Sequence, residues 1–191
     1  MVLAGCNTTP APEATTPADQ ADVELQIVGR HFDKVHQPGL PRTDGHAAGE
    51  EALFDTIEGA LDVGVKWLTV YAFSSDNWKR PGAEVRALMW LLESYLQNEV
   101  ASCVERGVRL EAIGRRDRLP ARVRDAIAEA ERATAPGSAL RLRLAIDYSS
   151  RDAIARAAAH GPRSHEELAR HLAPAADRPA PDVDLLVRTG G

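Results

Sequence analysis

Short apolar runs alternate with helical patterns along most of this 191-residue chain, and no other feature constrains the fold as strongly. The runs are rich in β-branched and aromatic residues, as strands are, while apolar residues between them recur with the period of a helix. Such alternation forms crossover units, so we expect an α/β fold with a mostly parallel central sheet and helices on both faces. The expected strands cover 23–28, 66–73, 108–114, 140–148 and 184–187, and the expected helices cover 45–63, 83–106, 120–134, 150–159 and a short segment after 164.

The first 22 residues differ in composition from the rest. They are rich in Thr, Pro and Ala and have no apolar period, so we expect a disordered leader at 1–22 and a single domain at 23–191. The stretch LAGC at 3–6 resembles the lipidation site of a bacterial lipoprotein, but the basic segment and apolar core that precede such a site are missing. A shortened signal peptide and a chance match are both compatible with this stretch.

Charge and cysteine content narrow the classes of partner. The formal net charge of −5 argues against a general nucleic-acid binder, which carries a basic excess or a basic face. No apolar run approaches the length of a membrane span. The two cysteines, Cys6 and Cys103, form neither a metal-ligand spacing nor a disulfide framework. We expect Cys103 to be a buried thiol within a helix.

A cluster of polar and charged side chains follows the expected strand at 66–73. In parallel sheets, ligands bind beyond the carboxyl ends of the strands, which is where this cluster lies. The cluster offers hydroxyls at Ser74 and Ser75, a carboxylate at Asp76, an amide at Asn77, a flat apolar ring at Trp78, and cations at Lys79 and Arg80. These groups suit a ligand with a phosphorylated head and an apolar body. A polar turn whose side chains only satisfy its own backbone is the alternative interpretation.

Three further cationic residues are candidates for the same ligand. Arg42 and His46 flank the start of the helix at 45–63, where free N–H groups and the helix dipole attract anions. A simple N-terminal cap by Thr43 or Asp44, with an exposed arginine beside it, explains this segment equally well. Arg188 precedes two glycines at the end of the last expected strand. Together these loops predict a polyphosphate site.

The long helix at 83–106 has a broad apolar face. Its members are Val85, Leu88, Met89, Leu91, Leu92, Leu96 and Val100. A helix packed on a sheet needs such a face for the core, and a tunnel for a hydrocarbon chain would be lined by the same residue types. The periodicity therefore predicts burial and leaves a tunnel open.

Four stretches, GLPRTDGHAAGEEAL, VKWLTVYAFSSDNWKRPGAEVRALMWLL, RLRLAIDYSSRDAI and DVDLLVRTGG, resemble the cis-prenyltransferases of the undecaprenyl diphosphate synthase type. The resemblance runs in order from Gly39 to Gly191. It implies an isoprenyl transferase that condenses isopentenyl diphosphate with an allylic diphosphate, such as farnesyl diphosphate, to give a cis-polyprenyl diphosphate. It further implies Mg²⁺ as cofactor, a homodimer, a cytoplasmic location, and peripheral membrane association through the product.

Residue roles carry over from the family position by position. The resemblance implies that Arg42 and His46 contact a diphosphate and that Arg188 holds the diphosphate of isopentenyl diphosphate. It places Ser74, Ser75 and Asp76 in the substrate loop and Glu84 in the same sequence block. It also implies that Asn77 assists proton removal and that Trp78 and Arg80 bind substrate. The apolar helix at 83–106 would form one wall of the product tunnel.

The sequence departs from the family at two places. The family's first strand ends in DGNGRW, whose aspartate carries Mg²⁺, and counting back from Pro41 without gaps puts that aspartate on Gly29, which has no side chain to ligate a metal. His31, Asp33 and His36 could imitate a metal cluster, although a solvated polar loop is the simpler interpretation. The family also continues beyond RTGG into a segment with a further metal-binding glutamate and part of the dimer surface. The metal ligands of this chain are therefore left unassigned.

These departures lead us to expect a scaffold with impaired catalysis and a final strand without its covering helix. An active enzyme in which another acid replaces the missing one remains an alternative. Others are an inactive relative that binds isoprenoid diphosphates or pairs with an active subunit, and a non-functional gene fragment. A generic nucleotide-binding protein is disfavoured because no G-x-G-x-x-G or P-loop pattern is present.

Overall fold

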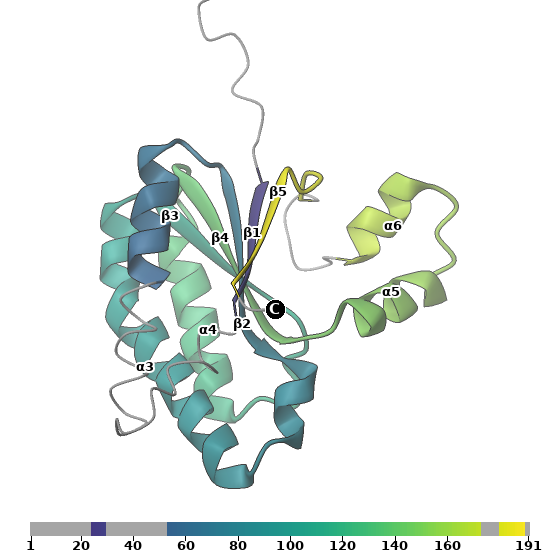
Figure 1. The fold of residues 1–191 in the computed structure, drawn as a ribbon, viewed down its shortest axis with the longest axis horizontal. Coiled ribbons are helices and arrows are strands. Elements are labelled where there is room, and N and C mark those ends of the chain that lie inside the picture. Colours follow the sequence, from purple (N-terminus) through teal and green to yellow (C-terminus); the bar gives the residue numbers. More distant parts are fainter. Residues whose placement is uncertain (1–23, 30–52, 173–179, 190–191) are drawn as a thin grey trace, which may run out of the picture.

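The computed structural model describes residues 24–29, 53–172 and 180–189. Within them, five strands form one sheet in the order β3-β4-β2-β1-β5, and every neighbouring pair is parallel (Figure 1). The strands are β1 (Glu24–Gly29), β2 (Trp67–Ser74), β3 (Val108–Ile113), β4 (Leu140–Tyr148) and β5 (Leu185–Thr189). The predicted α/β fold with a parallel sheet is confirmed. The expected leader, and the segment with Arg42 and His46, lie outside the described residues.

Helices lie on both sides of the sheet, as expected (Figure 1). They are a helix over 53–62, the short 3-10 helix η1 (Ser75–Lys79), α3 (Gly82–Glu105), α4 (Ala121–Thr134), α5 (Ser150–Ala159) and α6 (His165–Leu172). Helices α3 and α4 pack against one side, while α5 and α6 pack on each other and stand away from the sheet on the other. Pro120 is the N-cap of α4 and not its first residue. Ser164 and Glu167 have the spacing of a capping box at the start of α6, but the box is only half formed: Ser164 Oγ accepts from the N–H of Glu167, whereas the Glu167 carboxylate accepts from the N–H of Arg163.

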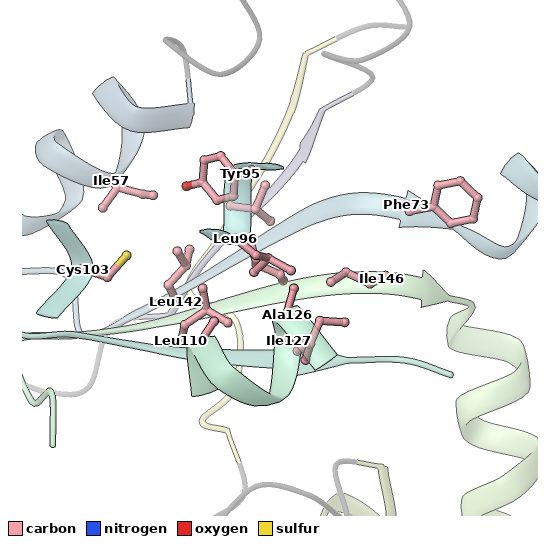
Figure 2. Close-up of a cluster of buried hydrophobic side chains, with 14 of the residues drawn as sticks. Ile57, Phe73, Tyr95, Leu96, Cys103, Leu110, Ala126, Ile127, Leu142 and Ile146 are labelled. Atoms are coloured by element: carbon pink, nitrogen blue, oxygen red, sulfur yellow. The ribbon is translucent and has the colours of Figure 1, made fainter. Parts of the chain in front are cut away.

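The core lies between the sheet and helices α3 and α4 (Figure 2). Strand β4 is buried along most of its length because it has a neighbour on each side and helices above it. On α3, Leu88 and Leu96 are buried, as the apolar period predicts. Cys103 is buried in the same layer, and burial raises the pKa of its thiol. It is therefore the buried, inert thiol that we expect from its place in a helix.

Strand β3 is an edge of the sheet, and helix α4 satisfies its outward-facing backbone groups. The N–H of Leu110 donates to Thr134 Oγ1 at 3.0 Å, and the N–H of Ala112 donates to Glu131 Oε1 at 2.8 Å. Arg116 donates from Nη2 to the Ala112 carbonyl at 3.1 Å and also binds Glu131. Thr134 and Glu131 of α4, together with Arg116 from the loop before it, thus bond three backbone groups that a further strand would otherwise pair.

Strand β5 forms the opposite edge and carries exposed apolar side chains. Leu185 is 54% exposed and Leu186 is 58% exposed. On this edge, β1 is the one neighbour of β5 in the described sheet.

Gly114 marks the place where the end of β3 is pressed against the end of β4. Its φ is +120°, and a Cβ there would overlap the carbonyl oxygen of Ile146. We predict that Gly114→Ala lowers the free energy of unfolding by at least about 2 kcal/mol, because it combines backbone strain with a clash against main chain. Denaturant unfolding followed by circular dichroism measures this loss.

Gly59→Ala is the matched control. Gly59 lies inside the helix over 53–62, and an added Cβ meets no atom within 4 Å. The same substitution should there raise the free energy of unfolding by ~0.5–1 kcal/mol, since alanine is the better helix former. Equal effects at the two sites would contradict the close contact between the ends of β3 and β4.

Candidate functional site

The carboxyl ends of the parallel strands bring distant parts of the sequence to one rim of the sheet. At this rim Ser74 pairs with Tyr148 of β4, and Gly29 pairs with Thr189 of β5. Strand β1 also pairs with β2, so the backbone of Arg188 lies two strands away from the loop that follows Ser74. One rim of the sheet therefore carries the polar loop, Gly29 and the backbone of Arg188 and Thr189, as expected for the carboxyl ends of parallel strands. Arg42 and His46 belong to the part of the chain that is not described.

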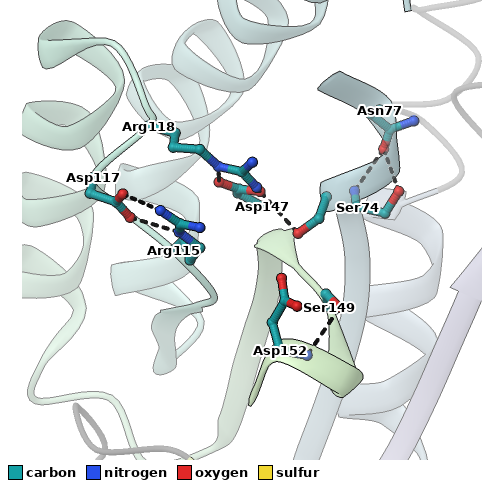
Figure 3. A network of polar contacts seen from close by, with 9 residues as sticks. Ser74, Asn77, Arg115, Asp117, Arg118, Asp147, Ser149 and Asp152 are labelled. Carbon is teal, nitrogen blue, oxygen red and sulfur yellow. Dashed lines mark hydrogen bonds and ion pairs between the residues drawn. The ribbon is translucent and has the colours of Figure 1, made fainter. Parts of the chain in front are cut away.

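Within η1, the amide of Asn77 has a fixed orientation. Its Oδ1 accepts from the Ser74 N–H at 2.6 Å and from Ser74 Oγ at 2.9 Å (Figure 3). A backbone N–H can only donate, so the oxygen must face Ser74 and the amide NH₂ must point away from it. Ser74 is thus the residue that orients Asn77, and Asn77 presents a hydrogen-bond donor beyond the strand.

Trp78 combines an inward-facing ring with a place in the polar loop. It is half-buried and packs edge-to-face on Phe73, with ring centroids 5.2 Å apart. The guanidinium of Arg118 lies over the ring, 5.6 Å from its centroid. The ring of Trp78 therefore folds toward the core, although the residue belongs to the polar loop.

The charged residues of the loop are engaged in ion pairs with one another. Arg80 Nη1 lies 2.6 Å from Glu84 Oε1, and this pair is about a quarter exposed. Lys79 Nζ lies 2.8 Å from Asp76 Oδ1 in a pair that is largely exposed. The hydrogen bond and charge of Lys79 lower the pKa of Asp76, and Asp76 raises the pKa of Lys79. Glu84 therefore orients Arg80 at the start of α3, while Asp76 and Lys79 form a solvated pair.

Two residues at this rim were missed by the sequence reasoning. Asp147 is buried at the end of β4, where it accepts from Ser75 Oγ at 3.1 Å and pairs with Arg118 (Figure 3). Arg118 comes from the loop between β3 and α4. The available signal was an acid at the end of an expected buried strand, at the same sheet edge as the serine loop.

The described residues do not fit a magnesium site. No group of three or more His, Cys, Asp or Glu side chains lies close enough together in them to hold a metal. Asp147 is paired with Arg118, Asp76 is paired with Lys79, and β1 ends at Gly29, which offers no carboxylate. Because Mg²⁺ prefers carboxylate oxygens that are free to bind it, we assign no step to a metal here.

A small apolar cavity of about 30 Å³, room for roughly one water molecule, lies on the side of the sheet covered by α3. It is lined by Leu53, Ala72, Phe73, Leu88, Leu91, Leu92, Tyr95 and Leu144. Two of these residues, Ala72 and Phe73, immediately precede Ser74 on β2. Strand β2 thus contributes both to the polar rim and to this apolar space, but at its present volume the space does not hold a hydrocarbon chain.

The fold and this rim define an α/β protein with a polar loop at the carboxyl ends of its strands, and comparison with known proteins identifies the family. Residues 30–191 match the family model Prenyltransf, "Putative undecaprenyl diphosphate synthase". The chain belongs to this family.

Curated relatives agree with the family model. The chain is 53% identical over 157 residues to Isoprenyl transferase 1 of Bradyrhizobium diazoefficiens, covering 80% of this chain and 63% of that one. It is 42% identical to a trans,polycis-polyprenyl diphosphate synthase of Thermobifida fusca, covering 81% of this chain and 58% of that one. The chain therefore spans about three-fifths of the length of these relatives.

Solved structures share the fold. A probable undecaprenyl diphosphate synthase from Campylobacter jejuni is similar at a TM-score of 0.72 and 30% identity, covering 91% of this chain and 77% of that one. Lavandulyl diphosphate synthase from Lavandula x intermedia, solved with dimethylallyl diphosphate, is similar at a TM-score of 0.76 and 29% identity, covering 87% and 76%. In the described part of this chain, no helix has the length and apolar character needed to cross a membrane.

The orientation of Asn77 can be tested with two substitutions. Asn77→Ala removes the acceptor of both Ser74 bonds and should lower the free energy of unfolding by about 1–2 kcal/mol. Asn77→Asp keeps an oxygen at the Oδ1 position and should leave stability close to that of the parent. Denaturant unfolding compares the two, and equal losses would show that the acceptor oxygen does not hold the loop.

Proposed function

We propose that this chain binds an allylic isoprenoid diphosphate, with the diphosphate at the sheet rim and the hydrocarbon between β2 and α3, where the small apolar cavity must widen to admit it. The single observation that carries the proposal is that two residues lining the cavity, Ala72 and Phe73, directly precede the polar loop at 74–80 on strand β2. A diphosphate needs hydrogen-bond donors and cations, whereas an isoprenoid chain needs a water-free apolar wall. Both requirements meet at Phe73 and Ser74.

The reaction that this arrangement supports is an isoprenyl transfer. Isopentenyl diphosphate condenses with the bound allylic diphosphate, diphosphate leaves, and a proton is lost to give a new cis double bond. The amide NH₂ of Asn77 donates toward the rim and positions a diphosphate oxygen during proton removal. Trp78 and Arg80 bind substrate, with Arg80 held in place by Glu84. Arg42, His46 and Arg188 supply further cationic contacts.

The end of β1 supports impaired catalysis in this chain. The register of β1 with β5 puts Gly29 beside Thr189 at the rim, and the family resemblance implies an aspartate at this position. Without that carboxylate and its Mg²⁺, two diphosphates held together repel each other, and the departing diphosphate loses electrostatic support. Losing one such group costs on the order of 10²–10³ in rate.

The homodimer, the cytoplasmic location and the peripheral membrane association through product belong to the same proposal.

A second candidate function follows from the same residue. With glycine at this position, the chain can bind an isoprenoid diphosphate without converting it, either alone or as the partner of an active subunit. Ser74, Asn77 and the apolar cavity are all retained in such a binding protein. Turnover therefore separates the two functions, while binding is common to both.

The first test combines binding with turnover. The purified chain, Gly29→Asp and the uncharged control Gly29→Asn are incubated with farnesyl diphosphate, labelled isopentenyl diphosphate and Mg²⁺. We expect the parent to bind farnesyl diphosphate with little turnover, and Gly29→Asp to raise turnover on the order of 10²-fold. Gly29→Asn should remain at the level of the parent.

Each other result of this test has a definite meaning. Parent turnover at the rate of an ordinary enzyme would contradict impairment and favour replacement of the missing acid by another. Binding without turnover in the parent and in both variants would favour the inactive binding protein. Absence of farnesyl diphosphate binding would contradict the proposed function and favour a non-functional fragment.

The cavity can be tested separately from the rim. Ala72→Leu adds side-chain volume to the cavity wall, and overpacking costs about 1–3 kcal/mol. We predict that it weakens farnesyl diphosphate binding roughly tenfold but leaves inorganic diphosphate binding unchanged. Calorimetry measures both affinities, with Ala158→Leu on the exposed side of α5 as the control. An equal effect on the two ligands would show that the hydrocarbon does not occupy this cavity.

A further inference from the structure

Asp147 has an unusual position for a charged residue. Its carboxylate is fully buried at the end of β4, and its backbone φ is +50°, in the left-handed region that non-glycine residues rarely adopt. A buried carboxylate is costly unless it is paired and hydrogen-bonded. The buried charge and the unfavourable backbone conformation of Asp147 both lie at the rim of the sheet, beside the candidate binding loop.

Arg118 compensates this charge in a bidentate geometry. Its Nε donates to Asp147 Oδ2 at 2.8 Å, and its Nη2 pairs with Oδ1 (Figure 3). The two residues come from different elements, because Arg118 lies in the loop between β3 and α4. The N–H of Arg115 also donates to the Asp147 carbonyl at 3.2 Å, so that loop is attached to the end of β4 by main chain as well.

This ion pair reaches both ends of η1. At the start of η1, Ser75 Oγ donates to Asp147 Oδ1 at 3.1 Å. Near its end, the ring of Trp78 lies beneath the guanidinium of Arg118. Since η1 has five residues and none of them is fully buried, it depends on such contacts for its conformation. Asn77, which presents its amide NH₂ beyond the strand, lies between the two attached residues.

We propose that the Arg118–Asp147 pair is a positioning element that holds Ser75 and Trp78, and thereby presents Asn77 toward the rim. The pair acts through these residues and does not itself contact ligand. Its consequence for ligand binding rests on the function proposed above, but its effect on the loop does not. The competing explanation is a buried ion pair that stabilises the whole domain evenly.

The two partners are not equivalent toward an anionic ligand. Removal of Arg118 leaves the Asp147 carboxylate uncompensated beside Ser75, which repels a diphosphate at the rim. Removal of the Asp147 charge loosens the loop equally but leaves a cation near it. If the pair only stabilises the fold, removing either partner should change the affinity for an anion equally.

The loop is tested in the full chain without ligand. Hydrogen–deuterium exchange is measured for the amides of 75–79 and for the core strand β4, together with the indole N–H signal of Trp78 in nitrogen-labelled protein. Asp147→Asn and Arg118→Gln should each speed exchange at 75–79 about fivefold or more relative to β4, and should shift the Trp78 signal. Asp117→Asn, the same chemical change at the exposed partner of Arg115, should do neither.

Two milder variants keep the test decisive if the first two fail to fold. Ser75→Ala cuts one attachment and should speed exchange at the start of η1 while leaving the Trp78 signal in place. Arg118→Lys keeps the charge, loses the bidentate geometry and should move the Trp78 signal. Equal acceleration at 75–79 and in β4, or an unmoved loop in these variants, would overturn the proposal.

Inorganic diphosphate is the probe for the ligand arm. We expect Arg118→Gln to weaken its binding roughly tenfold, and Asp147→Asn to weaken it less, because the remaining Arg118 cation offsets the loosened loop. Equal weakening in the two variants would overturn the charge argument. If the parent binds no diphosphate, the proposed function fails, whereas the exchange and indole results still decide whether the pair positions the loop.

Discussion

Parallel hydrogen-bonded pairing is the constraint from which the rest of this structure follows. Because all neighbouring strands run in the same direction, their carboxyl ends share one rim, and residues far apart in sequence meet there. Ser75 and Asp147 are 72 positions apart, yet they are joined by a hydrogen bond because β2 and β4 end side by side. The crossover helices that parallel pairing requires also build the apolar wall behind the loop.

The sequence alone predicts the parts of the fold that have a strong period. Strand β4 and helix α3 are long and regular, so their bounds fall within one or two residues of expectation. The loop after β2 is also predictable, since its polar residues stop an apolar strand abruptly. The Arg80–Glu84 pair follows from the (i, i+4) spacing of opposite charges near a helix start.

Contacts between distant elements are not available from local patterns. Arg118 and Asp147 lie 29 positions apart in two segments that have no common period, and their meeting depends on how the β3–α4 loop packs against β4. The half-formed capping box at α6 shows the same limit on a smaller scale, because a motif of the right spacing can find another N–H one residue away. Burial of Trp78 against Phe73 likewise depends on where the core ends and not on the loop sequence.

The side chains that α4 places along β3 have a consequence for behaviour at high concentration. An incoming peptide strand would have to break the bonds of Glu131 and Thr134 before it gained a single ladder bond of its own. That initial cost makes this edge a poor template for aggregation, even though the strand is regular and its backbone lies near the surface. Protection of this kind needs no charged residue or proline within the strand itself, so β3 remains free to keep the alternating pattern that anchors it in the core.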